Sequence, residues 1–356
     1  AMYPDSENNL WLALDKGISM VRLSRPIQFI QSFSPSIGSV YSLNFLPPDR
    51  LYLATNQGLY SGNFSTSSLS LTQVQVDKQI KGQVWTLDRF DNQLFCGNNE
   101  ETYQIIPDRK VVSWSKGGMC MSKGIIHGRE VLVQGTYSDL VIYTKENGEW
   151  KFHSNVRDFL NPIKTVSVDY QGRIWATHMH QGMFVMKLNP DLTTVENIRE
   201  YTSLDNKNPS LIYTYTLNNR VVFTDNRRFY VYDDIKNEIV PFAKLNKALG
   251  KYSNAYKITH QRSSVYWFIK NEEAALVELK EDKTHIIDRV QYSLFLNQTV
   301  DNFQNIIPVS DEMALFTLEN GLALYKLNEN QRTPSAVKRE ILLIEAAVVG
   351  KNSEEK

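Results

Sequence analysis

Apolar and polar residues alternate in short runs along much of the chain, and residues 162–185 show the pattern most clearly. Val166 and Val168 alternate with polar neighbours, which is the period of a half-buried strand. Residues 169–172 (Asp-Tyr-Gln-Gly) have the composition of a turn, and the apolar run 174–177 follows as a second strand. A further turn leads into a third strand. Such a unit cannot bury its own apolar faces, so we expect copies of it elsewhere in the chain.

The second strand of this unit recurs along the whole chain as a short, mostly apolar run. The second residues of the eight runs are Trp11, Tyr52, Phe95, Leu132, Trp175, Val222, Tyr266 and Ala314. The steps between them are 41, 43, 37, 43, 47, 44 and 48 residues. Blades of a β-propeller are four-stranded sheets that repeat at about 40–50 residues. The spacing therefore predicts an all-β protein built as a β-propeller.

The first strand of the unit recurs only seven times, because the copy at Trp11 has no such strand before it. These strands are expected to begin at Ser39, Gln83, Gly118, Pro162, Ser210, Asn254 and Asn302. We therefore predict a seven-bladed β-propeller over residues 34–330, with an eight-bladed ring as the alternative. Residues 1–33 would be a partial repeat, either the end of an earlier repeat or strands that close the ring. A short helical turn is expected at 241–250, a segment that ends in a glycine.

Composition and charge narrow the class of protein. The 356 residues are enough for a large buried core, and an aromatic content of 11% suits a chain of strands. Lys and Arg together number 39, as do Asp and Glu, so the formal net charge is zero. A nucleic-acid-binding face needs an excess of positive charge, so we expect no direct contact with nucleic acid. No apolar run reaches the roughly 18 residues of a membrane helix, and we expect any targeting or membrane segment to lie outside this sequence.

Residues 331–356 differ in character from the repeats. The segment 331–335 contains a proline among polar residues and is predicted to be a linker. The segment 340–351 is predicted to be one strand, and the polar residues 352–356 are predicted to be a tail. A single strand is not stable alone, so we expect it to pack on the propeller or to belong to a further module.

The repeat also resembles that of a known family. Its motif is Asp-x-x-Gly-x-apolar-Trp followed by Gly-apolar, which stands here at 169–175 and 182–183, with further copies at 10–19 and 51–60. On these residues the chain resembles the periplasmic sensor propellers of membrane-spanning regulators of Bacteroidetes, with two-component-regulator propeller repeats, over about residues 9–330. Several copies depart from the motif, because Glu101, Arg228 and Glu272 stand near the place of the turn glycine.

The resemblance implies a function and a domain arrangement. Proteins of this family carry two tandem propellers, a tyrosine-rich immunoglobulin-like module and a membrane helix. Their cytoplasmic part is a histidine kinase with response regulator or a LuxR-like DNA-binding domain. The resemblance implies that this chain is the second propeller of a periplasmic sensor and that 340–351 begins the immunoglobulin-like module. The expected partners are the adjacent propeller and that module, and signalling would use two arrangements of a homodimer.

One face of a propeller collects the loops before the innermost strands and the turns between second and third strands, and we place the candidate ligand site there. Its side chains are aromatic rings, amides, histidines and an arginine. The candidate ligand-binding residues are Tyr41, Asn56, Trp85, Asn98, Tyr137, His178, His180, Arg227 and Tyr256. Aromatic rings beside hydrogen-bonding groups suit a sugar, which has an apolar ring face and a rim of hydroxyls, so we expect an oligosaccharide. The alternative is that Tyr41, Trp85 and Tyr256 only pack between blades.

No metal, cofactor or catalytic residue is predicted. His178 and His180 lie on one side of an extended strand, but a metal would need a third ligand, so ordinary packing is favoured. Cys96 and Cys120 fall in neighbouring blades and are expected to be small buried residues, with a disulfide as the alternative. Asp169 is expected to accept backbone N–H groups in its turn.

Two other functions stay open beside the sensor. One is a propeller lyase or glycosidase, although no paired carboxylates fall at matching loop positions in the sequence. The other is a spacer or dimerisation scaffold that binds no ligand.

Overall fold

The computed structural model describes residues 1–5, 9–22, 27–31, 33, 36–47, 49–106, 109–205, 210–280, 283–327, 348–350 and 353–355. In these residues the protein is all-β and consists of several four-stranded antiparallel sheets, as the sequence repeats predicted. The one α-helix of the described residues, α1 (Ala243–Leu249), lies where a short helical turn was expected. Two 3₁₀-helices are η1 (Gly250–Asn254) and η2 (Tyr292–Phe295).

Six of the four-stranded sheets are each formed by four consecutive strands. Their strands are β5 (Val40–Leu46), β6 (Arg50–Thr55), β7 (Gly58–Ser65), β8 (Ser70–Lys81); β9 (Val84–Phe90), β10 (Gln93–Asn98), β11 (Glu101–Ile106), β12 (Arg109–Lys116); β13 (Gly118–Ile126), β14 (Arg129–Thr136), β15 (Leu140–Glu146), β16 (Glu149–Asn155); β17 (Ile163–Val168), β18 (Ile174–His178), β19 (Met183–Leu188), β20 (Val195–Tyr201); β21 (Tyr213–Leu217), β22 (Arg220–Thr224), β23 (Phe229–Asp233), β24 (Glu238–Pro241); β25 (Lys257–Arg262), β26 (Val265–Ile269), β27 (Glu273–Leu279) and β28 (Thr284–Gln291).

A further four-stranded sheet joins the two ends of the repeat region. It contains β29 (Ile306–Ser310), β30 (Met313–Leu318), β31 (Gly321–Lys326) and, from the other end of the chain, β4 (Ile27–Ile30). β4 pairs antiparallel with β31, and Ile30 lies opposite Leu322. Both side chains are buried in one cluster with Val40 of the next sheet. The last sheet is therefore completed by a strand that precedes the first.

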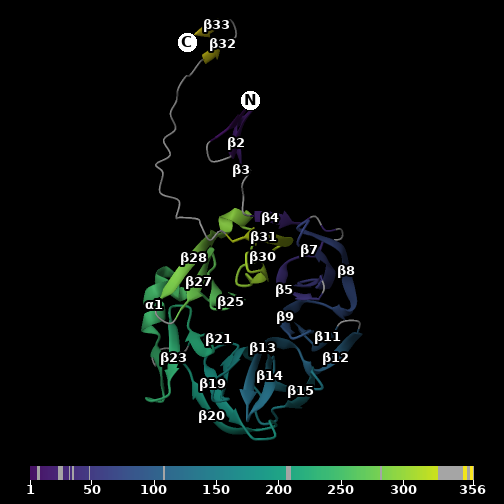
Figure 1. Cartoon of the computed structure of the whole chain (residues 1–356), viewed down its shortest axis with the longest axis vertical. Helices are drawn as coiled ribbons and strands as arrows, with labels where there is room; N and C mark the ends of the chain where they lie inside the picture. Colours follow the sequence, from purple (N-terminus) through teal and green to yellow (C-terminus); the bar gives the residue numbers. More distant parts are fainter. Residues whose placement is uncertain are drawn as a thin grey trace.

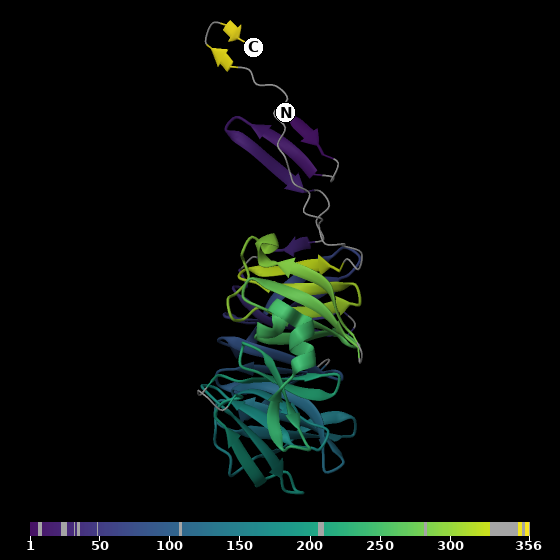
Figure 2. The ribbon, with the colours of Figure 1, turned by 90° about the vertical axis from the view of Figure 1, so that its left-hand side faces the viewer.

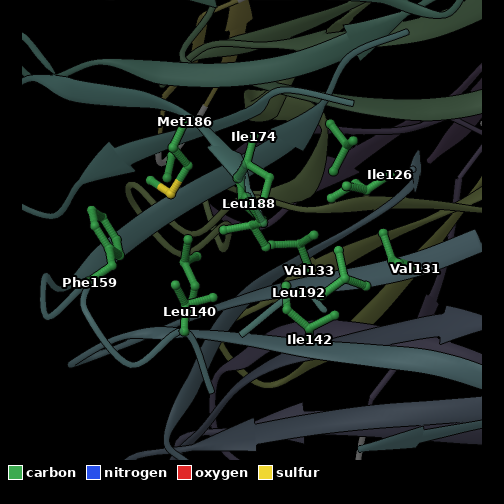
Figure 3. Packing of buried hydrophobic residues seen from close by; sticks show 14 of the residues in the cluster. Ile126, Val131, Val133, Leu140, Ile142, Phe159, Ile174, Met186, Leu188 and Leu192 are labelled. Carbon is green, nitrogen blue, oxygen red and sulfur yellow. The ribbon is translucent and has the colours of Figure 1, made fainter. Parts of the chain in front are cut away.

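Hydrophobic clusters lie between successive four-stranded sheets, and each cluster takes residues from two sheets. Figure 3 shows the cluster between the sheets β13–β16 and β17–β20, in which Leu140 and Ile142 face Ile174 and Met186. The cluster around Ile30 and Val40 joins the last sheet to the first. The sheets of the described residues consequently follow one another around a closed ring (Figure 1).

The turn after β17 explains why the clearest repeat folds as it does. The backbone N–H groups of Gln171 and of Arg173 both donate to Oδ1 of Asp169, at 2.9 and 3.0 Å. Oδ2 accepts from Nε of Arg173 at 2.6 Å and from the indole N–H of Trp175 at 2.8 Å. Gly172 adopts the left-handed conformation with φ 73°. The expectation that Asp169 holds its turn is confirmed.

Two smaller sheets contain the residues nearest the ends of the chain. β1 (Met2–Pro4), β2 (Asn9–Leu14) and β3 (Gly17–Arg22) form a three-stranded sheet, which lies outside the ring (Figure 2). β32 (Val348–Gly350) pairs with β33 (Ser353–Glu355). The predicted linker 331–335 and residues 340–347 and 351 of the predicted strand lie outside the described residues. β33 lies within residues 352–356, which were predicted to be a polar tail.

Three innermost strands begin later than the repeats predicted. β21 begins at Tyr213 rather than Ser210, β25 at Lys257 rather than Asn254, and β29 at Ile306 rather than Asn302. The residues before β25 form the 3₁₀-helix η1, which ends at Asn254. Asn302 has a φ of 62°, in the left-handed region that a strand does not use. Short loops at these three places shift the residues that reach the centre of the ring.

Candidate functional site: the central cavity

A cavity of about 1370 Å³ lies at the centre of the ring. The innermost strand of each four-stranded sheet contributes to its wall, and Figure 1 shows β5, β9, β13, β21 and β25 on the inner side of the ring. Representative lining residues from these strands are Tyr41, Asp88, Met121, Lys164, Thr214, Lys257 and Ile307. Loops on one face of the ring add further lining residues, so the cavity is bounded by a mouth as well as by the channel wall.

Three aromatic side chains from two neighbouring sheets and a loop form a cluster in this lining, which we call the aromatic cluster. The rings of Tyr41 and Trp85 stack with centroids 5.3 Å apart and an interplanar angle of 17°. The ring centroid of Phe303 lies 4.9 Å from that of Tyr41 and 5.6 Å from that of Trp85. Phe303 is 40% exposed, so the cluster has apolar area open to solvent. Offset aromatic groups of this kind present flat apolar faces to a ligand.

Amide side chains fix the polar ends of two of these rings. Gln83 donates from Nε2 to the hydroxyl of Tyr41 at 2.8 Å. The indole N–H of Trp85 donates to Oδ1 of Asn99, which also accepts from the hydroxyl of Tyr137 at 3.4 Å. The orientation of the rings is therefore set by hydrogen bonds as well as by packing.

Tyr256 also lines the cavity and lies directly before β25. Its hydroxyl donates to Oε1 of Gln304, and its backbone oxygen accepts from the hydroxyl of Tyr215 at 2.7 Å. Burial raises the pKa of Tyr256 well above its ordinary value. The phenol of Tyr256 therefore stays protonated across the physiological pH range.

Charged groups line the wall below the loops. Nζ of Lys164 on β17 lies 5.1 Å from the ring centroid of Tyr213 on β21. Burial raises the pKa of Asp88 on β9 to about 6, and the positive charge of Lys257 opposes that rise. Burial likewise lowers the pKa of Lys257 on β25 to about 8, and the negative charge of Asp88 opposes that fall. The two groups thus attract each other without an ion-pair contact in the described structure.

Another lining carboxylate, that of Glu273, is already engaged. Oε1 of Glu273 lies 2.7 Å from Nζ of Lys251 and 3.7 Å from Nζ of Lys270. Its Oε2 accepts from the hydroxyl of Tyr252 at 2.8 Å and from Nε2 of Gln291 at 2.7 Å. These partners hold the pKa of Glu273 below its ordinary value, although burial opposes them. Glu273 therefore has a structural role at the rim.

The structure brings four of the nine predicted site residues together in the cavity lining. These are Tyr41, Trp85, Tyr137 and Tyr256. All four are half-buried, so they pack against neighbours and also face the cavity. The packing of Tyr41, Trp85 and Tyr256 is thus observed, and their role in ligand binding stays a prediction.

The other five predicted residues do not line the cavity. Asn56 accepts the backbone N–H of Ser39 at 3.0 Å, and buried Asn98 accepts those of Glu100 and Glu101 at 2.9 and 2.7 Å. Arg227 is 62% exposed at its side chain and pairs with Asp225 at 3.1 Å. The two amides stabilise turns, and the arginine points to solvent.

His178 and His180 also lie outside the cavity lining. Nδ1 of His178 accepts the backbone N–H of His180 at 3.2 Å, and the two ring centroids are 5.7 Å apart. His178 also packs edge-on against Phe184. No group of three or more potential metal ligands of the His, Cys, Asp and Glu types occurs in the part of the chain that the structure describes.

The turns that carry these residues do face the cavity, but through a neighbouring side chain. Met179 lines the cavity between His178 and His180, and Asn226 lines it beside Arg227. Residue type alone favoured the histidines and the arginine, whereas the position in the turn decides which side chain reaches the cavity.

Sequence reasoning also missed Phe303, Tyr213 and the pair Asp88 and Lys257. Phe303 was placed in a first strand, but it lies in the loop before β29, which frees its ring to join Tyr41 and Trp85. Tyr213 and Thr214 of β21 also line the cavity. Asp88 and Lys257 lie inside innermost strands, where alternation alone does not indicate which residues meet across a ring.

Comparison with known proteins supports the fold. No protein-family model and no curated protein matches the sequence. Among solved structures, the extracellular domain of a protein from B. thetaiotaomicron described as a hybrid two component system superposes with a TM-score of 0.65 at 13% identity. The match covers 92% of this chain and 45% of that one. The two share one fold.

Two further structures extend the comparison. The extracellular domain of a second B. thetaiotaomicron protein described in the same way gives a TM-score of 0.56 at 13% identity, over 86% of this chain and 40% of that one. Virginiamycin B lyase from Staphylococcus aureus, in a catalytically inactive variant with quinupristin, gives a TM-score of 0.56 at 10% identity. This match covers 85% of this chain and 99% of the lyase chain. The chain thus spans less than half the length of the two extracellular domains. None of the described helices is long and apolar enough to span a bilayer.

Proposed function

We propose that the chain is the periplasmic sensor domain of a membrane-spanning transcriptional regulator and that it binds an oligosaccharide-type ligand in its central cavity. On this proposal the seven four-stranded sheets of the described residues are the blades of one seven-bladed β-propeller, closed by β4. The likeness in fold to two extracellular domains of B. thetaiotaomicron regulators supports this assignment, as does the repeat motif around Asp169 and Trp175.

The aromatic cluster in a large cavity is the observation that carries the ligand proposal. The volume of about 1370 Å³ exceeds the 300–1,000 Å³ of typical small-molecule pockets, so it suits a ligand of several sugar units. The exposed face of Phe303, beside Tyr41 and Trp85, offers an apolar platform on which the apolar face of a sugar ring can stack. Hydroxyl and amide side chains of the wall would bind sugar hydroxyls.

The signal would pass to the rest of the protein by a shift between two arrangements. A ligand shifts such an equilibrium only by the difference between its affinities for the two arrangements. The proposed partners are an adjacent propeller, an immunoglobulin-like module and a second copy of the protein, and this region makes no direct contact with nucleic acid.

Calorimetric titration of the full chain with plant, host and microbial oligosaccharides tests this proposal. We expect saturable binding by at least one class, and loss of that binding in Trp85→Ala with the fold retained by circular dichroism. Trp11→Ala is the matched control, because Trp11 is 41% exposed on β2 outside the ring. Absence of binding across the panel would contradict ligand recognition and favour a spacer or dimerisation scaffold.

Catalysis in the cavity is the second candidate, because Asp88, Glu272 and Glu273 all line it and a lyase has a similar fold. Glu273 is held by two lysines, a tyrosine and a glutamine, which leaves Asp88 and Glu272 for acid–base work. Incubation of any bound oligosaccharide with the protein, followed by mass spectrometry of the products, distinguishes the two functions. Cleavage that is lost in Asp88→Asn would replace the sensor proposal with an enzymatic one.

A further inference from the structure

Successive strands β17, β21 and β25 form one side of the cavity wall, and they carry an excess of positive charge. Lys164 and Lys257 both line the cavity and are half-buried. Nζ of Lys164 lies over the ring of Tyr213, and no carboxylate of the described residues is within ion-pair distance of it. Placing a cation against an aromatic ring is favourable but does not neutralise its charge.

The negative charge of Asp88 offsets the positive charge of Lys257 but not that of Lys164. Asp88 acts electrostatically on Lys257, but the described structure contains no direct hydrogen bond or ion pair between them. Lys123 and Lys270, which also line the cavity, pair with Glu130 at 2.8 Å and with Glu273 at 3.7 Å. Lys164 is therefore a cavity-lining ammonium without a partner of opposite charge in the described residues.

Polar atoms on the same side of the wall lack hydrogen-bond partners. Thr214 is only 3% exposed, lines the cavity, and its hydroxyl has no partner. The hydroxyl of Thr259 and Oδ1 of Asn226 also lack a hydrogen-bond partner, and both residues line the cavity. These three atoms have almost no accessible surface, so a ligand in the cavity does not contact them, and the charged groups of the wall decide which ligand fits.

We propose that Lys164 and Lys257 bind an anionic oxygen group of an acidic sugar unit, so that the ligand of the cavity is an acidic oligosaccharide. This proposal rests on the proposed function, because it assumes that a sugar chain occupies the cavity. The ammonium groups donate to the anionic oxygens. The aromatic cluster then holds a neighbouring sugar ring by stacking.

Two kinds of acidic sugar carry such a group, a uronate with a carboxylate and a sugar sulfate ester. Both present negatively charged oxygens, and a lysine binds either as a point charge. The test therefore uses both, each with a matched neutral partner. Uronate-containing oligosaccharides are compared with their methyl esters, and sulfated oligosaccharides with their desulfated forms, by calorimetric titration of the full chain.

We expect at least one acidic oligosaccharide to bind, and we expect esterification or desulfation to weaken binding about tenfold or more, as is usual when a charge-assisted hydrogen bond is lost. Lys164→Met should weaken binding of the acidic form to a similar extent and leave the neutral form unaffected. Lys164→Arg keeps the charge and should retain most of the affinity. Lys187→Met, at an exposed position of β19, is the matched control and should change nothing.

Each remaining outcome has a defined consequence. A neutral oligosaccharide that binds as tightly as its acidic partner, with no effect of Lys164→Met, would overturn the inference on acidic sugars and leave the sensor proposal intact. Binding of acidic sugars that Lys164→Met and Lys257→Met both leave unchanged would also overturn it. A silent panel would overturn the sensor proposal itself, and this inference with it.

Discussion

The ring of Tyr41 on β5 stacks on the ring of Trp85 on β9, with centroids 5.3 Å apart and planes inclined by 17°. The two residues lie in different sheets, and Phe303 from a third part of the chain contacts both. The aromatic cluster thus depends on the closure of the ring, because Phe303 precedes the last sheet and Tyr41 belongs to the first.

Replacing Trp85 by Ala should lower the free energy of unfolding by about 1–3 kcal/mol, since two aromatic contacts and part of a buried surface are lost. The effect is moderate because Trp85 is only half-buried. Urea unfolding followed by circular dichroism measures it, with Trp11→Ala as the control. A loss of more than about 5 kcal/mol would indicate that Trp85 is mainly a core residue and would argue against its role as a ligand platform.

Two neighbouring residues of one turn should differ in their effect on ligand affinity. Asn226 lines the cavity, whereas Arg227 is 62% exposed and pairs with Asp225. We expect Asn226→Ala to weaken binding of a cavity ligand several-fold and Arg227→Ala to leave it unchanged. Titration of both variants with the same ligand checks this. The reverse order would place the ligand outside the cavity, on the surface of the turns.

Closure of the ring should depend on β4. Ile30 is 7% exposed and packs with Val40 and Leu322 at the junction of the last and first sheets. Ile30→Ala should cost about 2–4 kcal/mol of stability, because it leaves a cavity at that junction. Ile18→Ala, at a position of β3 that is 76% exposed, should stay within about 0.5 kcal/mol of the parent. Equal effects in the two variants would contradict a closing role for β4.

The stability of the protein should depend on pH through Asp88. Its folded-state pKa of about 6 lies above the ordinary value of 3.8, so the native protein holds this proton more tightly than the unfolded chain. The contribution of Asp88 to stability is therefore complete below about pH 4 and is lost as the pH rises towards about 6. Above pH 6 the ionised carboxylate of Asp88 destabilises the fold because it is buried. Its attraction to Lys257 reduces this destabilisation.

Asp88→Asn should therefore be more stable than the parent at pH 7.5, by about 1–2 kcal/mol after allowance for the partial exposure of the carboxylate to the cavity. The difference should shrink towards pH 4. Thermal unfolding of both proteins between pH 4 and 8 measures it. If Asp88→Asn instead loses stability relative to the parent as the pH rises from 4 to 7.5, the attraction of Asp88 to Lys257 outweighs the cost of burying its charge.

The turn at Asp169, a buried residue, should be among the turns of the ring that are most sensitive to substitution. Its carboxylate accepts two backbone N–H groups, the guanidinium of Arg173 and the indole of Trp175. Asp169→Ala would leave these donors unsatisfied and should cost about 3–4 kcal/mol. Asp311→Ala, at an exposed turn, is the control and should have little effect. Chemical denaturation measures both, and similar losses would argue against a structural role for Asp169.

The sequence was a good guide to the sheets, because most of the four-stranded sheets are built from four consecutive strands. The alternation at Val166 and Val168 and the turn at Asp169 predict strands that the structure confirms as part of β17 and its turn. The regular spacing of runs such as that at Trp175 predicts several four-stranded sheets, since every repeat must bury the same pattern of side chains.

The site was harder to predict, because it depends on which side chains of different sheets meet at the centre. A shift of the start of β29 from Asn302 to Ile306 places Phe303 in a loop and brings it to Tyr41. Similarly, Met179 rather than the neighbouring histidines lines the cavity. A shift of a few residues in a loop does not alter the hydrophobic pattern of a strand, so the pattern carries no information about it.

The most direct test of the central claim is the thermal unfolding of the full chain and of Trp85→Ala in the presence of the oligosaccharide panel. A ligand at a hundred times its dissociation constant stabilises the folded state by about 2.7 kcal/mol, so the parent should unfold several degrees higher with that ligand. The account predicts that Trp85→Ala, folded in the absence of ligand, shows no such rise while Trp11→Ala shows the full rise. An equal rise in the parent and in Trp85→Ala would contradict the cavity as the ligand site.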